Sequence, residues 1–159
     1  MALTEKERLS LENALEQIAL AEKAAQALWF SYQRCPEIGD EKDFSEVDWE
    51  RWDALTARFA RLVDILTQRV FRAIDVAEFI PADSTFIDRI NRAEKRGYIR
   101  SALTWKEIRE IRNQIVHEYT IQHILALLQD TYAHVPEILE SVKRLGEYKK
   151  EIEKRLTRD

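Results

Sequence analysis

The sequence is poor in the residues that make tight turns, covalent cross-links and membrane spans. Its 159 residues include three glycines, three prolines and a single cysteine. One cysteine cannot form an internal disulfide, and no set of cysteines and histidines has the spacing of a metal site. No apolar run approaches the ~18 residues of a membrane span, and the N-terminal residues lack a signal peptide's apolar core. We therefore expect a cytoplasmic protein with no metal and no cofactor.

Strand-like alternation, internal repeats and low-complexity tracts are also absent, and helical spacing of apolar residues takes their place. The length fits a single domain over residues 1–159. The expected helices run over about residues 4–34, 47–79, 84–96, 104–129 and 136–156. Apolar stripes at this spacing are typical of helices that share one core. We predict an all-α bundle of about five helices with up-down topology.

The predicted helix boundaries rest on capping and helix-breaking residues. Residues 4–7 (TEKE) and 104–107 (TWKE) each read as a capping box, with Thr at the N-cap and Glu three residues later. Ser84 is a candidate N-cap for the short third helix, and Gly97 is its candidate stop. Pro136 is expected to mark the start of the final helix, because proline is poorly tolerated inside one.

An acidic segment follows the first helix. Residues 37–53 contain eight carboxylates (Glu37, Asp40, Glu41, Asp43, Glu46, Asp48, Glu50, Asp53) against Lys42 and Arg51. We interpret residues 37–46 as a solvated acidic loop that leads into a helix, since acidic residues favour helix N-termini. The alternative is a docking surface for a basic partner.

A basic segment precedes residue 113, although the whole chain has a net charge of −4. From residue 89 to residue 112 there are eight basic residues (Arg89, Arg92, Lys95, Arg96, Arg100, Lys106, Arg109, Arg112) and three acidic ones (Glu94, Glu107, Glu110). Basic side chains that contact phosphates supply most of the sequence-independent affinity for RNA. The candidate RNA-binding residues are Arg96, Arg100, Lys106 and Arg109. A solvated helix face with intrahelical ion pairs is the alternative.

Residues 112–119 (RNQIVHEY) combine groups suited to acid–base and phosphate chemistry. Histidine exchanges protons near neutral pH, and arginine offers a planar cation that matches phosphate. On one ideal helix, however, His117 lies about 140° from Arg112. A single chain would therefore not bring the two side chains together easily. Two copies of the helix facing each other across a two-fold axis would combine them in one cleft.

This R-x-x-x-x-H-x-Y pattern, with Asn113 after the arginine, resembles the signature of HEPN domains. More narrowly, it resembles the HepT toxins encoded beside a minimal nucleotidyltransferase (MNT) antitoxin in type VII toxin–antitoxin systems. The resemblance implies an HEPN-like bundle that acts as a homodimer. It also implies a metal-independent endoribonuclease that cuts tRNA or mRNA and leaves 2′,3′-cyclic phosphate ends. Arg112 and His117 would be catalytic, Asn113 supporting, and Tyr119 the residue to which the cognate nucleotidyltransferase attaches AMP.

Other functions remain open from the sequence. The chain could be a non-catalytic HEPN subunit that binds a nucleotide or substrate for a minimal nucleotidyltransferase. It could also be a plain helical interaction module whose acidic segment docks a partner. Individually, His117 could be a solvated surface residue and Tyr119 a core ring, since Tyr119 falls on the apolar stripe of its expected helix.

Overall fold

The computed structural model describes residues 2–39, 43–81, 83–117 and 123–158, and these form helices and loops without a strand. The elements are α1 (Glu5–Arg34), α2 (Glu46–Asp64), the π-helical η2 (Ile65–Val70), α3 (Phe71–Ala77), α4 (Phe86–Lys95), α5 (Ala102–Val116) and α6 (Ile124–Thr157). Because α2, η2 and α3 follow one another without a gap, the described residues form five helical rods. The predicted all-α bundle is confirmed.

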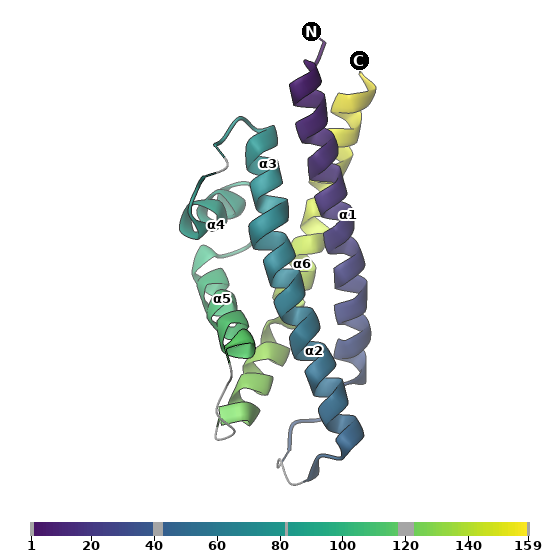
Figure 1. Ribbon diagram of the computed structural model, residues 1–159, viewed down its shortest axis with the longest axis vertical. Helices are drawn as coiled ribbons and strands as arrows, with labels where there is room; N and C mark the ends of the chain where they lie inside the picture. The colour runs from purple at the N-terminus through teal and green to yellow at the C-terminus, as the bar shows by residue number, and fades with distance from the viewer. Residues whose placement is uncertain (1, 40–42, 82, 118–122, 159) are drawn as a thin grey trace.

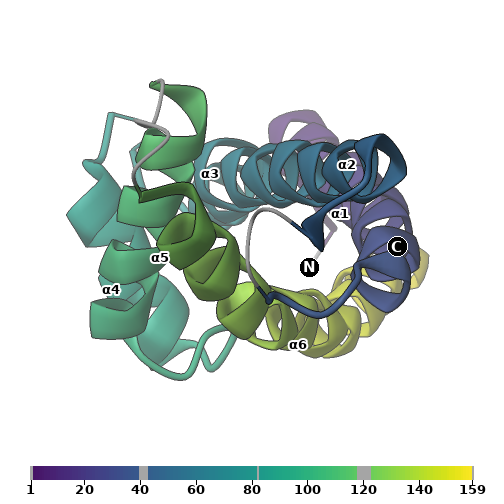
Figure 2. The same cartoon turned by 90° about the horizontal axis from the view of Figure 1, so that it is seen from below.

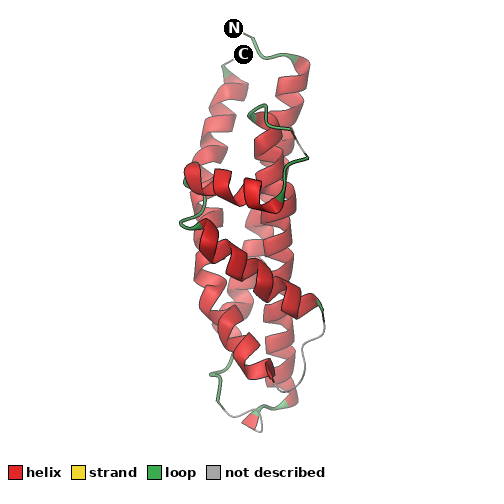
Figure 3. Cartoon of the chain, turned by 90° about the vertical axis from the view of Figure 1, so that its left-hand side faces the viewer, coloured by secondary structure: helices red, strands yellow, loops and turns green. Residues whose placement is uncertain are grey.

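Three long rods carry the fold. In Figure 1, α1 descends, α2 to α3 ascend beside it, and α6 returns upward, so that both chain ends lie at the top. Viewed from below, α4 and α5 lie together on one side of these rods (Figure 2). Figure 3 shows α4 lying across the long rods and α5 running obliquely below it. Helix α5 packs against α2 and α6, while α4 packs against η2, α3 and α5.

The core lies between these rods. On α1 the buried residues recur every three or four positions, as an amphipathic helix requires (Leu11, Ala14, Ile18, Ala21, Ala25, Leu28). Trp52 of α2 and Trp105 of α5 are almost fully buried, and Trp105 packs against the ring of Phe71. Each such side chain contributes roughly 1.5–3 kcal/mol or more by leaving water. None of the described helices combines the length and apolar character needed to cross a membrane.

Capping residues set the starts of α1 and α4. The predicted box at Thr4 is confirmed, because its hydroxyl accepts from the Glu7 N–H and the Glu7 carboxylate accepts from the Thr4 N–H. In α4 the N-cap is Thr85, one residue after the predicted Ser84. Thr85 forms the same reciprocal pair with Asp88.

Helix α5 begins earlier and ends sooner than its predicted range of 104–129. Its N-cap is Ser101, whose hydroxyl accepts from the Thr104 N–H, so the predicted cap at Thr104 is wrong. The helix ends at Val116, and His117 has φ −101° and ψ 64°, outside the helical region. Ile115 and Val116 are β-branched residues with reduced helix propensity, which favours a helix end there.

Helix α6 passes through the proline that was expected to start it. It runs from Ile124 to Thr157, so the predicted final helix over 136–156 is extended by about three turns at its N-terminal end. Pro136 lacks an N–H group, which deprives the carbonyl four residues earlier of its usual donor and costs about 3 kcal/mol. Buried Val135 and Ile138 on either side offset this cost by packing into the core.

The acidic loop ends one residue before its predicted limit of 46. Ser45 caps α2 through a reciprocal pair with Asp48, so Glu46 and Asp48 lie in the first helical turn. Carboxylates there stabilise the helix through its dipole, as the sequence predicted. Residues 40–42 lie outside the described part of the chain.

Two glycines are expected to respond oppositely to substitution by alanine. Gly97 ends α4 with φ 81°, as predicted, whereas Gly146 lies inside α6, and an added Cβ would meet nothing within 4 Å at either site. Gly97→Ala should therefore cost about 1–2 kcal/mol through left-handed strain alone. Gly146→Ala should stabilise the helix by up to about 1 kcal/mol. Urea unfolding of both variants measures this, and equal midpoints would contradict the assigned backbone geometry.

Candidate active site

Helix α5 presents its apolar face to the core and leaves Arg112 at the edge of that face. Trp105, Ile108 and Ile111 are buried, whereas the Arg112 side chain is 22 % exposed. This confirms the core stripe predicted for the described part of the helix. A half-buried arginine at such an edge can reach both a neighbouring helix and solvent, which suits a group that must be held in place and still meet a ligand.

Arg112 is held by Asp64, the last residue of α2. Its Nε and Nη2 atoms donate to Asp64 Oδ1 and Oδ2 at 2.7 and 2.8 Å, a two-pronged ion pair between helices. The third nitrogen, Nη1, donates to Asn113 Oδ1 at 3.3 Å. The hydrogen bonds to Asp64 raise the pKa of Arg112 above its ordinary value. The guanidinium is therefore a fixed cation whose plane is set by two neighbours.

A polar pocket of about 260 Å³ opens beside this pair. Its lining comes from α2, η2, α3, α4 and α5 (Val63, Asp64, Thr67, Gln68, Arg72, Phe86, Arg89, Arg109, Arg112, Asn113). Four of these residues are arginines and one is an aspartate, so the lining has a formal charge of +3. Such a concentration of cations around a concave surface attracts anions.

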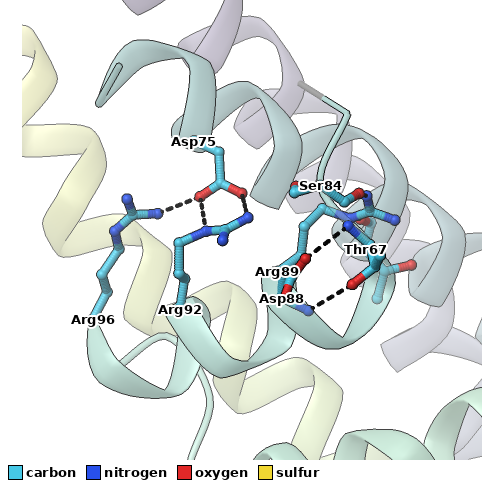
Figure 4. A network of polar contacts seen from close by, with 8 residues as sticks. Thr67, Asp75, Ser84, Asp88, Arg89, Arg92 and Arg96 are labelled. Atoms are coloured by element: carbon cyan, nitrogen blue, oxygen red, sulfur yellow. Dashed lines mark hydrogen bonds and ion pairs between the residues drawn. The ribbon is translucent and has the colours of Figure 1, made fainter. Parts of the chain in front are cut away.

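Arg89 is fixed in this pocket by backbone carbonyls. Its Nε donates to the Thr67 carbonyl at 2.9 Å and its Nη1 to the Ser84 carbonyl (Figure 4). Burial, followed by the nearby charge of Arg72, lowers the pKa of Arg89. A guanidinium held without a carboxylate of its own, among like charges, adds an unneutralised cation to the pocket.

The π-helical segment explains why a carbonyl is free to hold Arg89. At its end the Phe71 N–H donates to the Leu66 carbonyl, five residues earlier, and α3 then resumes α-helical spacing. This change of spacing leaves the next carbonyl, that of Thr67, without an intrahelical donor. Arg89 supplies the missing hydrogen bond. Single-turn π segments of this kind occur frequently at functional sites.

His117 lies at the end of α5, away from the core. Its side chain is exposed, and its N–H donates to the Asn113 carbonyl at 2.9 Å. Because the helix ends at Val116, His117 no longer follows the helical angle on which the predicted 140° separation depends. Both side chains are described, and no hydrogen bond or ion pair joins His117 to Arg112. Tyr119 lies outside the described residues, so its predicted place on the core stripe stays untested.

The four candidate RNA-binding residues separate into different environments. Arg109 lines the pocket, with its guanidinium carbon 4.3 Å from the centre of the Phe86 ring. Lys106 is exposed on α5. Arg96 binds buried Asp75 at 2.7 Å, and Arg100 lies 3.8 Å from Glu140. Ion pairs with residues of other helices therefore engage these last two residues, in place of the intrahelical pairs of the alternative interpretation, while Arg109 lines the pocket.

Three contributors to the pocket were missed from the sequence: Asp64, Arg72 and Arg89. Asp64 lies 48 positions before Arg112, so no local spacing relates them. One signal was present, because Asp64 interrupts the apolar run Leu62-Val63-Asp64-Ile65-Leu66. A carboxylate in such a run needs a partner from another helix.

The described residues form no metal site, and the chain matches no known protein in the comparisons. Within the described ranges, no three His, Cys, Asp or Glu side chains are grouped so that they could hold a metal ion. No protein-family model, curated protein or solved structure matches the chain.

Proposed function

We propose that this protein is a metal-independent endoribonuclease, the toxin of an HEPN/MNT toxin–antitoxin pair. The observation that supports it best is the place of Arg112, fixed by Asp64 and Asn113 at the edge of a pocket with a formal charge of +3. His117, five residues later, is exposed at the end of the same helix. A fixed cation and an accessible imidazole are the two groups that ribonucleolytic cleavage needs.

The proposed reaction is internal transfer of a phosphodiester. The ribose 2′-oxygen attacks the adjacent phosphorus while the bond from phosphorus to the 5′-oxygen breaks. The 2′-hydroxyl loses its proton to a base, and the departing 5′-oxygen gains one from an acid. The products are a 2′,3′-cyclic phosphate and a 5′-hydroxyl. His117 serves as base or acid, Arg112 stabilises the charge on the non-bridging oxygens, and Asn113 orients Arg112.

A complete site in this proposal requires a second chain. One imidazole supplies either the base or the acid, and no contact joins it to Arg112 within one chain. A homodimer arranged around two copies of α5 would supply two imidazoles and two guanidinium groups to one cleft. The exposed apolar side chain of Val116 (49 % exposed) next to His117 is compatible with burial in such an interface.

The proposal predicts a modification at Tyr119. Co-expression with the nucleotidyltransferase encoded next to this chain should increase its intact mass by one or more AMP units. Each AMP adds a negative charge and a bulky nucleoside near the site, which should block RNA. Tyr119→Phe should prevent the mass increase because it removes only the hydroxyl. An unchanged mass after co-expression of the unsubstituted chain would contradict the modification and leave the nuclease proposal standing.

One observation favours a second candidate, a non-catalytic nucleotide-binding subunit of the nucleotidyltransferase. The cationic pocket is complete within one chain, and Arg112 already has its charge balanced by Asp64. A purified-protein RNase assay in EDTA separates the two candidates. The ribonuclease should produce 2′,3′-cyclic phosphate ends without a divalent metal, whereas the binding subunit should leave RNA intact.

A further inference from the structure

The pocket beside Arg112 contains arginine side chains that are not paired with acidic residues of the described chain. Arg112 is paired with Asp64, and Arg89 is held by two carbonyls. Arg72 and Arg109, in contrast, have no carboxylate or hydrogen-bond acceptor among the residues that the structure describes, although both line the pocket. Both side chains are exposed, so they can donate to an anion that enters the pocket, and a group of like charges around a concave surface attracts such an anion.

The arginines approach the pocket from three elements. Arg72 lies on α3, Arg89 on α4 and Arg109 on α5, and the last two are held in defined positions. Arg89 is fixed by the carbonyls of Thr67 and Ser84, and the Arg109 guanidinium carbon lies 4.3 Å from the centre of the Phe86 ring. A cation–π contact with a ring leaves the N–H groups of the guanidinium without a hydrogen-bond acceptor, so they can donate to a ligand. Donors that converge from different directions match the tetrahedral arrangement of phosphate oxygens.

The size of the pocket restricts its occupant. Its volume of about 260 Å³ is below the ~300–1,000 Å³ of pockets that enclose a whole small-molecule ligand. A phosphoryl group with part of its sugar fits this space better than an entire nucleotide does. The only apolar side chains in its lining are Val63 and Phe86, which gives little surface for a buried base.

We propose that this pocket binds the phosphoryl group of a phosphate ester, with Arg72, Arg89 and Arg109 as its donors. The group is a backbone phosphate of an RNA strand that lies next to the one contacted by Arg112. This choice of RNA over a free nucleotide rests on the proposed ribonuclease. The phosphoryl site itself needs no cleavage chemistry, and its test is independent of activity.

Asp64 has two opposite effects on the binding of a phosphate. Its carboxylate fixes Arg112 but also adds negative charge to the pocket lining, where it repels an incoming phosphate. Replacing it with the isosteric amide removes this repulsion and retains an oxygen that accepts from Arg112. Asp64→Asn should therefore strengthen phosphate binding about tenfold, because repulsion between two charges a few ångströms apart changes a binding constant by about that factor.

Binding of a labelled 2′-O-methyl RNA decamer tests the proposal, because RNA without a 2′-hydroxyl cannot be cut by internal transfer. Arg72→Gln and Arg109→Gln should each weaken binding roughly tenfold or more, as loss of a charge-assisted hydrogen bond predicts. Arg158→Gln removes the same charge from an exposed position outside the pocket and should change binding less than about twofold.

Competition by AMP and by inorganic phosphate distinguishes the sources of the phosphoryl group. Weak competition by both compounds would support a phosphate of an RNA strand as the ligand. Tight binding of AMP that depends on Arg72 and Arg109 would overturn RNA as the source of the phosphoryl group, although the phosphoryl site itself would stand. Equal losses in the Arg72, Arg109 and Arg158 variants, or weaker binding by Asp64→Asn, would overturn the site itself. If the binding results overturn the phosphoryl site but the unsubstituted protein still cleaves RNA, the ribonuclease proposal stands.

Discussion

His117→Ala is expected to lower the rate of RNA cleavage about 10²–10⁴-fold, the usual contribution of a general acid or base. The substitution removes an exposed side chain that has no described hydrogen-bond partner, so the fold should remain unchanged. The rate of 2′,3′-cyclic phosphate formation in EDTA measures the loss. Circular dichroism should show the same helix content and unfolding midpoint as the unsubstituted protein.

His134→Ala is the matched control for this variant. His134 is also an imidazole on a helix, but it contacts Glu107 and the Asp130 carbonyl instead of the pocket. We expect its cleavage rate to stay within about twofold of the unsubstituted protein. Cleavage by His117→Ala at the rate of the control would remove His117 from the reaction and contradict the proposed mechanism.

Asp75→Ala is expected to destabilise the fold by about 3 kcal/mol. The Asp75 side chain is only 2 % exposed and binds Arg92 of α4 and Arg96, the residue that caps the end of α4 (Figure 4). Arg92 donates to both carboxylate oxygens at 3.1 and 2.7 Å, and Arg96 donates to one at 2.7 Å. Removing one side of a buried ion pair costs ~3–5 kcal/mol. The lower value applies because the arginines are about one-quarter exposed and can turn toward water.

Thermal unfolding measures this effect. For a chain of this size, 1 kcal/mol shifts the midpoint by roughly 2–4 °C, so a decrease of about 6–12 °C is expected. Asp88→Ala provides the control, because Asp88 lies on the same helix and forms only the exposed capping pair with Thr85. Its loss should cost about 1 kcal/mol. Equal midpoints for the two variants would show that the Asp75 pair does not anchor α4.

Local sequence patterns were sufficient to predict most of the fold. The apolar spacing located all five rods, and the reciprocal capping pattern located the start of α1 at Thr4. The two largest boundary errors arose because tertiary packing competes with local signals. Pro136 lies inside α6, where its flanking buried residues compensate for the lost hydrogen bond. The end of α5 at Val116 has no glycine or proline to announce it.

The candidate site was predictable only in part. The motif drew attention to Arg112, Asn113 and the basic residues before them, and the structure shows a hydrogen bond between Arg112 and Asn113. The partner Asp64 comes from a helix 48 positions away, and its orientation depends on how α2 packs against α5. The π-helical turn, which frees a carbonyl for Arg89, follows from tertiary packing and has no signature in a single sequence.

Mixing two inactive variants tests the proposed two-chain site most directly. Arg112→Ala and His117→Ala should each be inactive alone, whereas dissociating and reassociating them together should create mixed dimers whose shared cleft keeps one guanidinium and one imidazole. Half of the dimers would be mixed, so we expect the mixture to cleave RNA faster than either variant alone, at no more than about half of the unsubstituted rate. Mixed dimers verified by native mass spectrometry that cleave RNA no faster than either variant alone would contradict it.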